Sequence, residues 1–479
     1  MARRLFLVFL MGFLFLVSCA KREAKEVVDA LPDIFPDYTE VTVPGTIAPL
    51  NFMVKDAEHV QARFRNSAGE ELMAEGDDAI CLDESEWAAL LAKGGDIEVT
   101  VSIWDEGHPD GAAYRPFSIH VSHDAIDPYI TYRLIPPGYE GWQEMGIYER
   151  CLSSYEVKTL VDNAADRNAC MNCHTPCPGD SAAYVYHLRG EHGATLIHHD
   201  GMDERIDLRI LADGRHGSHP AWHPSGRWIA FSSNDTKQIF YARSRDKIEA
   251  FDLWSDLIIY DVKNKRALLD ERFTDSLHWE TYPCFSPDGR WLYFSTARSV
   301  HMPEQANELH YSLVRVSFDA ETGQLGDGVD TLYSTSQRGG TALMPRVSPD
   351  GKFLLYTVAE YGAFNLYHKE ADFEMIRIPA DSLEGNGIEE GSAKAIEGRP
   401  IDCDAINSAD AESYHAWSSN GRWMLFSSKR IDGRYTRLFI AHWDGREWSK
   451  PFLLPQQDPK QNILLLMAYN VAEFLGVKK

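Results

Sequence analysis

The sequence has few cysteines and too little positive charge to balance its acidic residues. Its 479 residues include 8 Cys, and 47 Lys plus Arg stand against 72 Asp plus Glu, a formal net charge of −25. A broad basic patch for nucleic acid or an anionic lipid surface is therefore not expected. The chain also lacks Gly-x-Ser-x-Gly, the nucleophile elbow of α/β-hydrolases. These absences argue against a nucleic-acid-binding protein and against a serine hydrolase, and no enzyme activity is expected.

Long apolar runs are also scarce. The most extended one, residues 5–17, follows two arginines and is too short to span a bilayer comfortably. This layout predicts an export signal over residues 1–18. The run ends in Leu-Val-Ser-Cys, which resembles the lipobox of bacterial lipoproteins and implies cleavage before Cys19 and lipidation of its thiol. We expect a lipid-anchored protein on the periplasmic side of a bacterial membrane, the outer membrane rather than the inner one; a plain secretory signal is the alternative.

The remaining composition is that of a folded protein. Apolar residues make up 44% and charged residues 25%, and the length suits two or three domains. Residues 19–40 are interpreted as a tether. In residues 41–134, short alternating apolar runs are separated by turns, with one helical stretch at 84–92. This pattern predicts a small β-sandwich resembling immunoglobulin or fibronectin modules.

The most specific motif is Cys170-Met171-Asn172-Cys173-His174. Cys-x-x-Cys-His is the attachment site of c-type haem, in which two thiols bind the porphyrin and the histidine ligates the iron. We expect one covalent haem c held by Cys170 and Cys173, with His174 as the iron ligand. The segment 135–182 around the motif is too short to bury a porphyrin alone. A short helix through 156–161 is expected to precede the motif.

Other chemistry is compatible with the same thiols. Zinc could be bound by Cys170, Cys173, His174 or Cys177, although no second ligand pair stands at zinc-finger spacing. A redox disulfide lacks the βαβ context, and an iron–sulfur run lacks a fourth thiolate. Cys151 and Cys177 flank the motif and could form a disulfide.

The second axial ligand of the iron is less specified. Histidines are frequent after the motif, and His187 is the nearest; Met202 is the thioether candidate. We predict His187, and an open sixth position is the alternative. The other candidates are His192, His198, His199, His216, His219 and His223.

A fourfold internal repeat decides the expected fold of the C-terminal region. Each copy has a turn of the Ser-Pro-Asp-Gly type followed by a basic residue and an aromatic, apolar strand. The turn glycines are Gly226, Gly289, Gly351 and Gly421. These copies resemble TolB-type, WD-like propeller repeats, which implies a β-propeller over residues 183–479. We expect an all-β protein with five or six blades, the ring being closed by residues 463–469.

Two functions are consistent with these features. The first is a membrane-anchored, periplasmic monohaem c-type protein that transfers electrons and whose propeller docks a redox partner. The alternative is a TolB-like binding scaffold of the cell envelope with a structural or sensory haem or zinc site. The sequence does not specify the partner.

Overall fold

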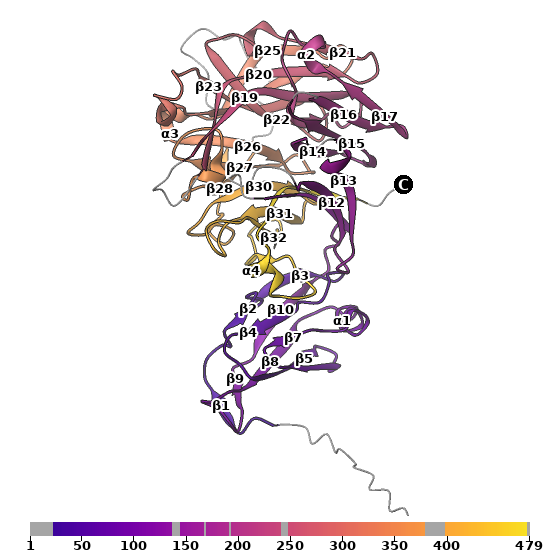
Figure 1. Ribbon diagram of the computed structural model, residues 1–479, viewed down its shortest axis with the longest axis vertical. Helices are drawn as coiled ribbons and strands as arrows, with labels where there is room; N and C mark the ends of the chain where they lie inside the picture. The colour runs from indigo at the N-terminus through magenta and orange to yellow at the C-terminus, as the bar shows by residue number, and fades with distance from the viewer. Residues whose placement is uncertain are drawn as a thin grey trace, which may run out of the picture.

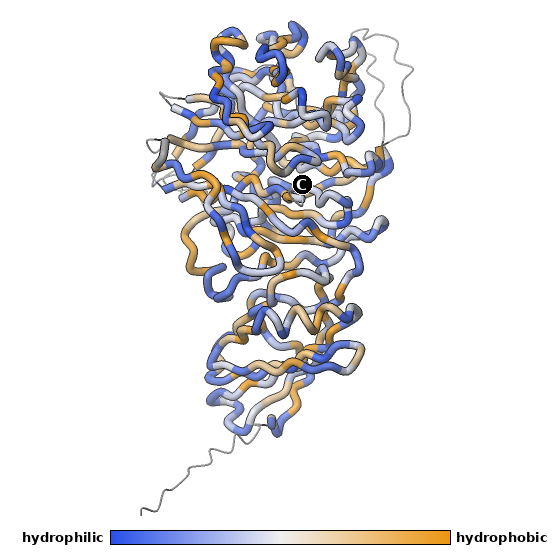
Figure 2. The backbone as a smooth tube through the Cα atoms, turned by 90° about the vertical axis from the view of Figure 1, so that its right-hand side faces the viewer, coloured by the Kyte–Doolittle hydropathy of each residue, from blue (hydrophilic) through white to orange (hydrophobic). Residues whose placement is uncertain are grey.

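The computed structural model describes residues 23–136, 144–166, 169–190, 193–240, 248–378 and 398–476. The predicted signal peptide and Cys19 lie outside these residues. The chain forms an elongated molecule with a narrow N-terminal part below a wider C-terminal part, and the view turned by 90° shows the same two parts (Figures 1 and 2). No helix in the described residues is long and apolar enough to cross a membrane.

The N-terminal part consists of two β-sheets and one helix. One sheet has seven strands, in which β8 pairs with β5, β9 and β10. Its strands are β1 (Glu26–Val28), β3 (Val41–Pro44), β5 (His59–Asn66), β6 (Glu71–Gly76), β8 (Ile97–Trp104), β9 (Ala112–Tyr114) and β10 (Phe117–Ser122). The other sheet has three strands, β2 (Ile34–Phe35), β4 (Phe52–Val54) and β7 (Ala79–Ile80). The strands expected in 41–121 are therefore present.

The predicted helix is also confirmed, as α1 (Glu84–Leu91). Asp83 caps it by accepting hydrogen bonds from the backbone N–H groups of Ser85 and Glu86. Trp87 is fully buried, and its indole N–H donates to the carbonyl of Ile47, so the helix is fixed to the sheets by a large apolar side chain with a satisfied polar atom.

The expected tether differs from the structure. From Glu26 onward the chain already pairs with the N-terminal sheets, since β1 runs parallel to β9 and β2 pairs with β4. The composition of this segment suggested a linker. Backbone hydrogen bonds to the edges of neighbouring strands give it a fixed structure from Glu26 onward.

The C-terminal part consists of six consecutive four-stranded sheets, the architecture of a β-propeller. The first sheet contains β11 (Tyr129–Ile135), β12 (Gly146–Cys151), β13 (Val157–Asp162) and the last strand of the chain, β34 (Ala468–Leu475). The second contains β14 (Met171–Cys177), β15 (Asp180–Leu188), β16 (Ala194–His199) and β17 (Met202–Ile206). The third contains β18 (Ser218–Trp222), β19 (Trp228–Phe240), β20 (Ile248–Asp261) and β21 (Arg266–Leu268).

The other three sheets continue the same order. The fourth contains β22 (His278–Phe285), β23 (Trp291–Arg298), β24 (Ser312–Phe318) and β25 (Leu325–Tyr333). The fifth contains β26 (Thr341–Val347), β27 (Phe353–Ala359), β28 (Asp372–Arg377) and β29 (Arg399–Ile401). The sixth contains β30 (Glu412–Trp417), β31 (Trp423–Ser428), β32 (Arg437–His442) and β33 (Phe452–Leu453). Short helical turns α2 (Leu208–Leu211), α3 (Thr335–Arg338) and α4 (Gln461–Leu464) lie in the connections, as do η2 (Asn163–Asp166), η3 (Glu271–Phe273), η4 (Ala306–Glu308) and η5 (Asn365–Tyr367).

The ring is closed by pairing the end of the chain with the first sheet. Strand β34 pairs with β11 and becomes the innermost strand of that sheet. Closure was expected at 463–469, but the strand begins only at Ala468, because 461–464 form a helical turn. Backbone hydrogen bonds between the two strands therefore join the first sheet to the end of the ring.

The segment predicted to carry the haem motif is part of the propeller. Residues expected to form a short helix near 156–161 instead form β13, which pairs with β12. The motif begins just before β14, the innermost strand of the second sheet, and its residues 171–174 lie on that strand. The propeller sheets therefore begin at Tyr129 rather than at 183. Cross-strand hydrogen bonds and packing override the local helical pattern here.

The N-terminal part packs on the rim of the propeller, against the sixth and first sheets. Its core residues form one continuous cluster with apolar residues of these sheets. The Asp127 carboxylate accepts hydrogen bonds of 2.6 Å from the backbone N–H and the hydroxyl of Ser419. The Trp423 indole N–H donates to the carbonyl of Ala125 at 3.0 Å. The connection between the two parts is thus a packed, hydrogen-bonded interface.

Candidate functional site at the propeller axis

Each of the six innermost strands contains one non-glycine residue with a left-handed backbone, φ between 36° and 54°. At each, the pairing with the neighbouring strand shifts register, as in a β-bulge. These six ring residues are Cys173, His219, Tyr282, Met344, Tyr414 and Val471. Such a backbone costs a non-glycine residue roughly 1 kcal/mol or more, and such outliers cluster at functional sites.

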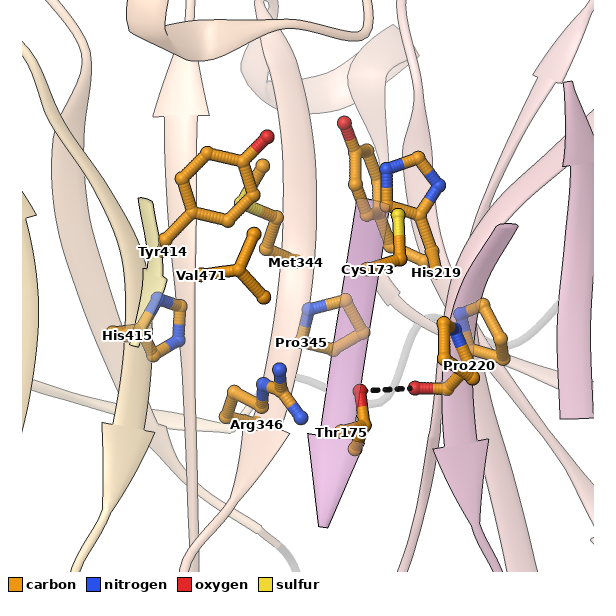
Figure 3. A pocket seen from close by; sticks show the side chains of 12 residues that line it. Cys173, Thr175, His219, Pro220, Met344, Pro345, Arg346, Tyr414, His415 and Val471 are labelled. Carbon is orange, nitrogen blue, oxygen red and sulfur yellow. Dashed lines mark hydrogen bonds between the residues drawn. The ribbon is translucent and has the colours of Figure 1, made fainter. Parts of the chain in front are cut away.

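The ring residues line one cavity on the axis, the axial channel, with a volume of about 50 Å³. Figure 3 shows Cys173 and His219 side by side, with Met344 and Tyr414 across the channel. Farther along the strands, the Thr175 hydroxyl donates to the carbonyl of Pro220 at 3.2 Å. The channel therefore presents a thiol, an imidazole and a thioether, which bind soft and borderline metals, together with two phenols.

The two thiols of the haem motif lie at the beginning of one strand. Cys173 is 3% exposed and lies in the channel, whereas Cys170 precedes β14 and is only partly buried. Burial raises the pKa of the Cys173 thiol, and the nearby Arg189 guanidinium lowers it. Both thiols are free, as are Cys151 and Cys177, so the disulfide that these two could form is absent from the structure.

His174 lies away from the channel. Its Nε2 forms a 3.0 Å hydrogen bond with the Thr131 hydroxyl of the first sheet, and its buried Nδ1 has no partner in the described part of the chain. Burial lowers the pKa of His174 to about 3. On an extended strand the imidazole and the Cys173 thiol project to different sides, whereas a helical motif would place them around one porphyrin.

His187 lies on the opposite face of the same sheet. Its ring stacks on His216 of the loop before the third sheet, with centroids 5.7 Å apart, and its Nδ1 bonds with the Thr195 hydroxyl. Because His174 faces the first sheet and His187 faces the third, the structure does not bring the two predicted iron ligands together. Met202 is 59% exposed on β17 and lies outside the channel lining.

His219 is the histidine that lies beside Cys173. Its Nδ1 bonds with the Ser232 hydroxyl at 3.2 Å, and burial lowers its pKa to about 3. The polar network continues from Ser232 through Thr281 and Asn234, whose amide donates to the buried Asp252 carboxylate at 2.7 Å. Hydrogen bonding at Nδ1 fixes the orientation of the ring, as supporting groups do for metal-binding histidines.

Two arginines lie beside the haem motif, at the end of the channel where β14 begins; we call this end the mouth. Arg133 is 7% exposed and donates to the Met171 carbonyl and the Asn172 side chain, both at 2.7 Å. The Arg189 backbone N–H donates to the carbonyl of Cys170 at 2.9 Å. Both guanidinium groups lower the pKa of Cys173 and that of His219.

The predicted zinc alternative is not preassembled. Among the described residues, which include Cys170, Cys173, His174 and Cys177, no three His, Cys, Asp or Glu side chains are grouped as metal ligands would be. A zinc site on this motif would require the strand to change conformation.

The ring residues were not recognised from the sequence, although a signal for them exists. His219, Tyr282, Met344 and Tyr414 stand at one fixed spacing before the turn glycine of their repeat copy. Cys173 stands one residue closer to its own turn, at Pro178-Gly179, so the haem motif belongs to a shortened fifth copy. Without the register of the strands, that spacing does not show which side chains face the axis.

No family model matches the sequence, and no curated protein matches it. Solved structures are similar in fold. The β-propeller domain of the Trilobed protease from Pyrococcus furiosus has 9% identity and a TM-score of 0.31, covering 74% of this chain and 81% of that one. The endo-arabinanase of Bacillus licheniformis has 12% identity and a TM-score of 0.31, covering 57% and 94%. Hydrazine synthase of Kuenenia stuttgartiensis has 11% identity and a TM-score of 0.28, covering 70% and 48%.

Proposed function

We propose that this protein is a c-type haem protein that transfers electrons, with its haem held at the mouth of the axial channel by Cys170 and Cys173. The observation that carries the proposal is the position of the motif. Its second thiol is a ring residue on the propeller axis, and its first thiol lies where the same strand begins. A covalent haem supplies one-electron transfer when bound.

The residues fit this group in part. The two thiols are free and close to the mouth. A cavity of about 50 Å³ holds water molecules but not a porphyrin, which needs on the order of several hundred Å³. The mouth, rather than the interior of the channel, is therefore the place for the porphyrin. His174 does not fit as an iron ligand while β14 keeps this conformation, because its imidazole lies against Thr131.

We further propose His219 as the protein ligand on the channel side. It lies next to Cys173, and its Nδ1 bonds with the Ser232 hydroxyl. The buried Ser232–Thr281–Asn234 network holds this ring in place. His187, on the far face of the sheet, would then have another role.

The rest of the chain suits a docking protein. We propose six TolB-like blades, one for each four-stranded sheet, and an immunoglobulin-like module that spaces the propeller from the membrane anchor at Cys19. A redox partner would dock over the channel mouth, where the connections between successive sheets lie. The acidic surface implied by the net charge of −25 favours a basic partner.

The experiment is a haem stain and a visible spectrum of the protein produced with haem-maturation machinery. Covalent stain is expected in the wild type and in Cys177→Ala, a matched control on the same strand, and is expected to be lost in Cys170→Ala/Cys173→Ala. His219→Ala should change the reduced spectrum, whereas His174→Ala should leave it unchanged. A colourless wild-type protein from a competent host would refute the proposal and leave the binding scaffold as the function.

A further inference from the structure

A second cavity, of about 130 Å³, lies on the face of the β14–β17 sheet opposite to His174. Four nitrogen-bearing side chains converge on it: His187 at the end of β15, Arg189 just after it, Arg209 in α2 and His216 before β18. We call it the His/Arg cavity. It is separate from the axial channel, and neither Cys170 nor Cys173 lines it.

The two imidazoles of the cavity are held in place, and burial disfavours their charged forms. Their rings stack at 24° with centroids 5.7 Å apart. His187 is 5% exposed; its Nδ1 bonds with Thr195, and no described residue bonds with its Nε2. Burial lowers the pKa of both histidines, and the Arg189 guanidinium lowers it further. A neutral imidazole carries one N–H, so His187 can donate it from Nε2 without adding charge.

Among the residues that the structure describes, the charges around the cavity do not balance. Arg209 is neutralised by Asp207, which accepts two hydrogen bonds of 2.8 Å from its guanidinium. Arg189 has no carboxylate within ion-pair distance and no side-chain hydrogen bond in the described part of the chain, and its Nε is buried. Arg189 lowers the pKa of Asp252, but the Asp252 carboxylate already accepts hydrogen bonds from Asn234 and Thr236.

A partly buried guanidinium that lacks a counter-charge is costly, and an anion removes that cost. The volume fits a few non-hydrogen atoms and excludes a nucleotide or a porphyrin. We infer that the His/Arg cavity binds a small oxyanion, a phosphate or carboxylate group, with Arg189 as the charged ligand and His187 as a neutral donor. The group can be a free ion or the end of a larger molecule. This inference is independent of the proposed haem.

The test is calorimetric titration of the full-length protein with inorganic phosphate. Arg189→Met is expected to lower the affinity at least roughly tenfold, as loss of a charge-assisted pair does. Arg290→Met is the matched control, because Arg290 is exposed and bonds with Asp288 in a turn; it should bind as the wild type does. Arg189→Lys keeps the positive charge, and its affinity for phosphate should lie between those of the wild type and Arg189→Met.

Three further comparisons complete the design. Stronger binding of glycerol phosphate than of phosphate would identify the anion as the end of a larger ligand, and equal binding would identify a free ion. Unchanged binding in Cys170→Ala/Cys173→Ala is expected and separates this site from the haem. No binding at roughly 10 mM phosphate, or equal binding by a folded Arg189→Met variant, would overturn the inference.

Discussion

Glu280 offers the sharpest test of the energetics of this propeller. It lies on β22, two residues before the ring residue Tyr282, and is 1% exposed. One carboxyl oxygen accepts a 2.9 Å hydrogen bond from the Thr296 hydroxyl, and the other has no partner in the described residues. Burial raises the pKa of Glu280 to about 8, and the charges of Asp256 and Asp275 act in the same direction.

The sign of the effect follows from these pKa values. The folded chain holds a proton on Glu280 up to about pH 8, whereas the unfolded chain loses it near the ordinary value of 4.5. The stabilisation is therefore complete below pH 4.5 and is lost as the pH rises through 8. Relative to pH 4.5 and below, the free energy of unfolding is lower by about 3 kcal/mol at pH 7 and by about 5 kcal/mol above pH 8.

The variant Glu280→Gln carries the neutral form at every pH. Its free energy of unfolding should match that of the wild type near pH 4.5 and exceed it increasingly up to pH 8. Urea unfolding of both proteins at several pH values measures this difference, in which the other titrating groups cancel. Parallel pH profiles of the two proteins would refute the reasoning.

A matched control exists in the sixth sheet. Glu412 holds the same position relative to the ring residue Tyr414, but Arg430 donates to it at 2.8 Å. Burial raises the pKa of Glu412 only to about 7, because Arg430 offsets part of the effect. Glu412→Gln should therefore raise the free energy of unfolding by less than Glu280→Gln does. This increase over the wild type should reach its maximum near pH 7.

Two further predictions concern turns and the interface. Gly289 and Gly351 both have a φ of +72°, but a Cβ at Gly289 would lie 2.2 Å from the His223 imidazole, whereas none of the described atoms lies within 4 Å of one at Gly351. Thermal unfolding should therefore show a loss of about 1 kcal/mol for Gly351→Ala and clearly more for Gly289→Ala. Asp127→Ala removes both hydrogen bonds to Ser419 and should cost about 2 kcal/mol. Limited proteolysis should then release the N-terminal part faster, and unchanged cleavage would contradict the interface described above.

Much of the fold was predictable because it is encoded locally. The turn glycines and the apolar strands after them indicated the propeller, and the alternating runs in 41–121 indicated the N-terminal strands. The segment 135–182 was not predictable in the same way. Its strands are stabilised by partners far away in sequence, as β11 is by β34. The local hydrophobic pattern does not indicate such long-range pairing.

The sequence by itself determined that the C-terminal region is a ring of repeated hairpins and that two thiols and a histidine stand in a Cys-x-x-Cys-His order. Only the tertiary structure decided where those groups face. The bulge in β14 turns Cys173 toward the axis and leaves His174 against Thr131, while the packing of the third sheet against the second brings His219 beside the thiol. Spacing along a chain specifies neighbours in sequence, whereas a β-bulge and the packing of adjacent sheets specify direction.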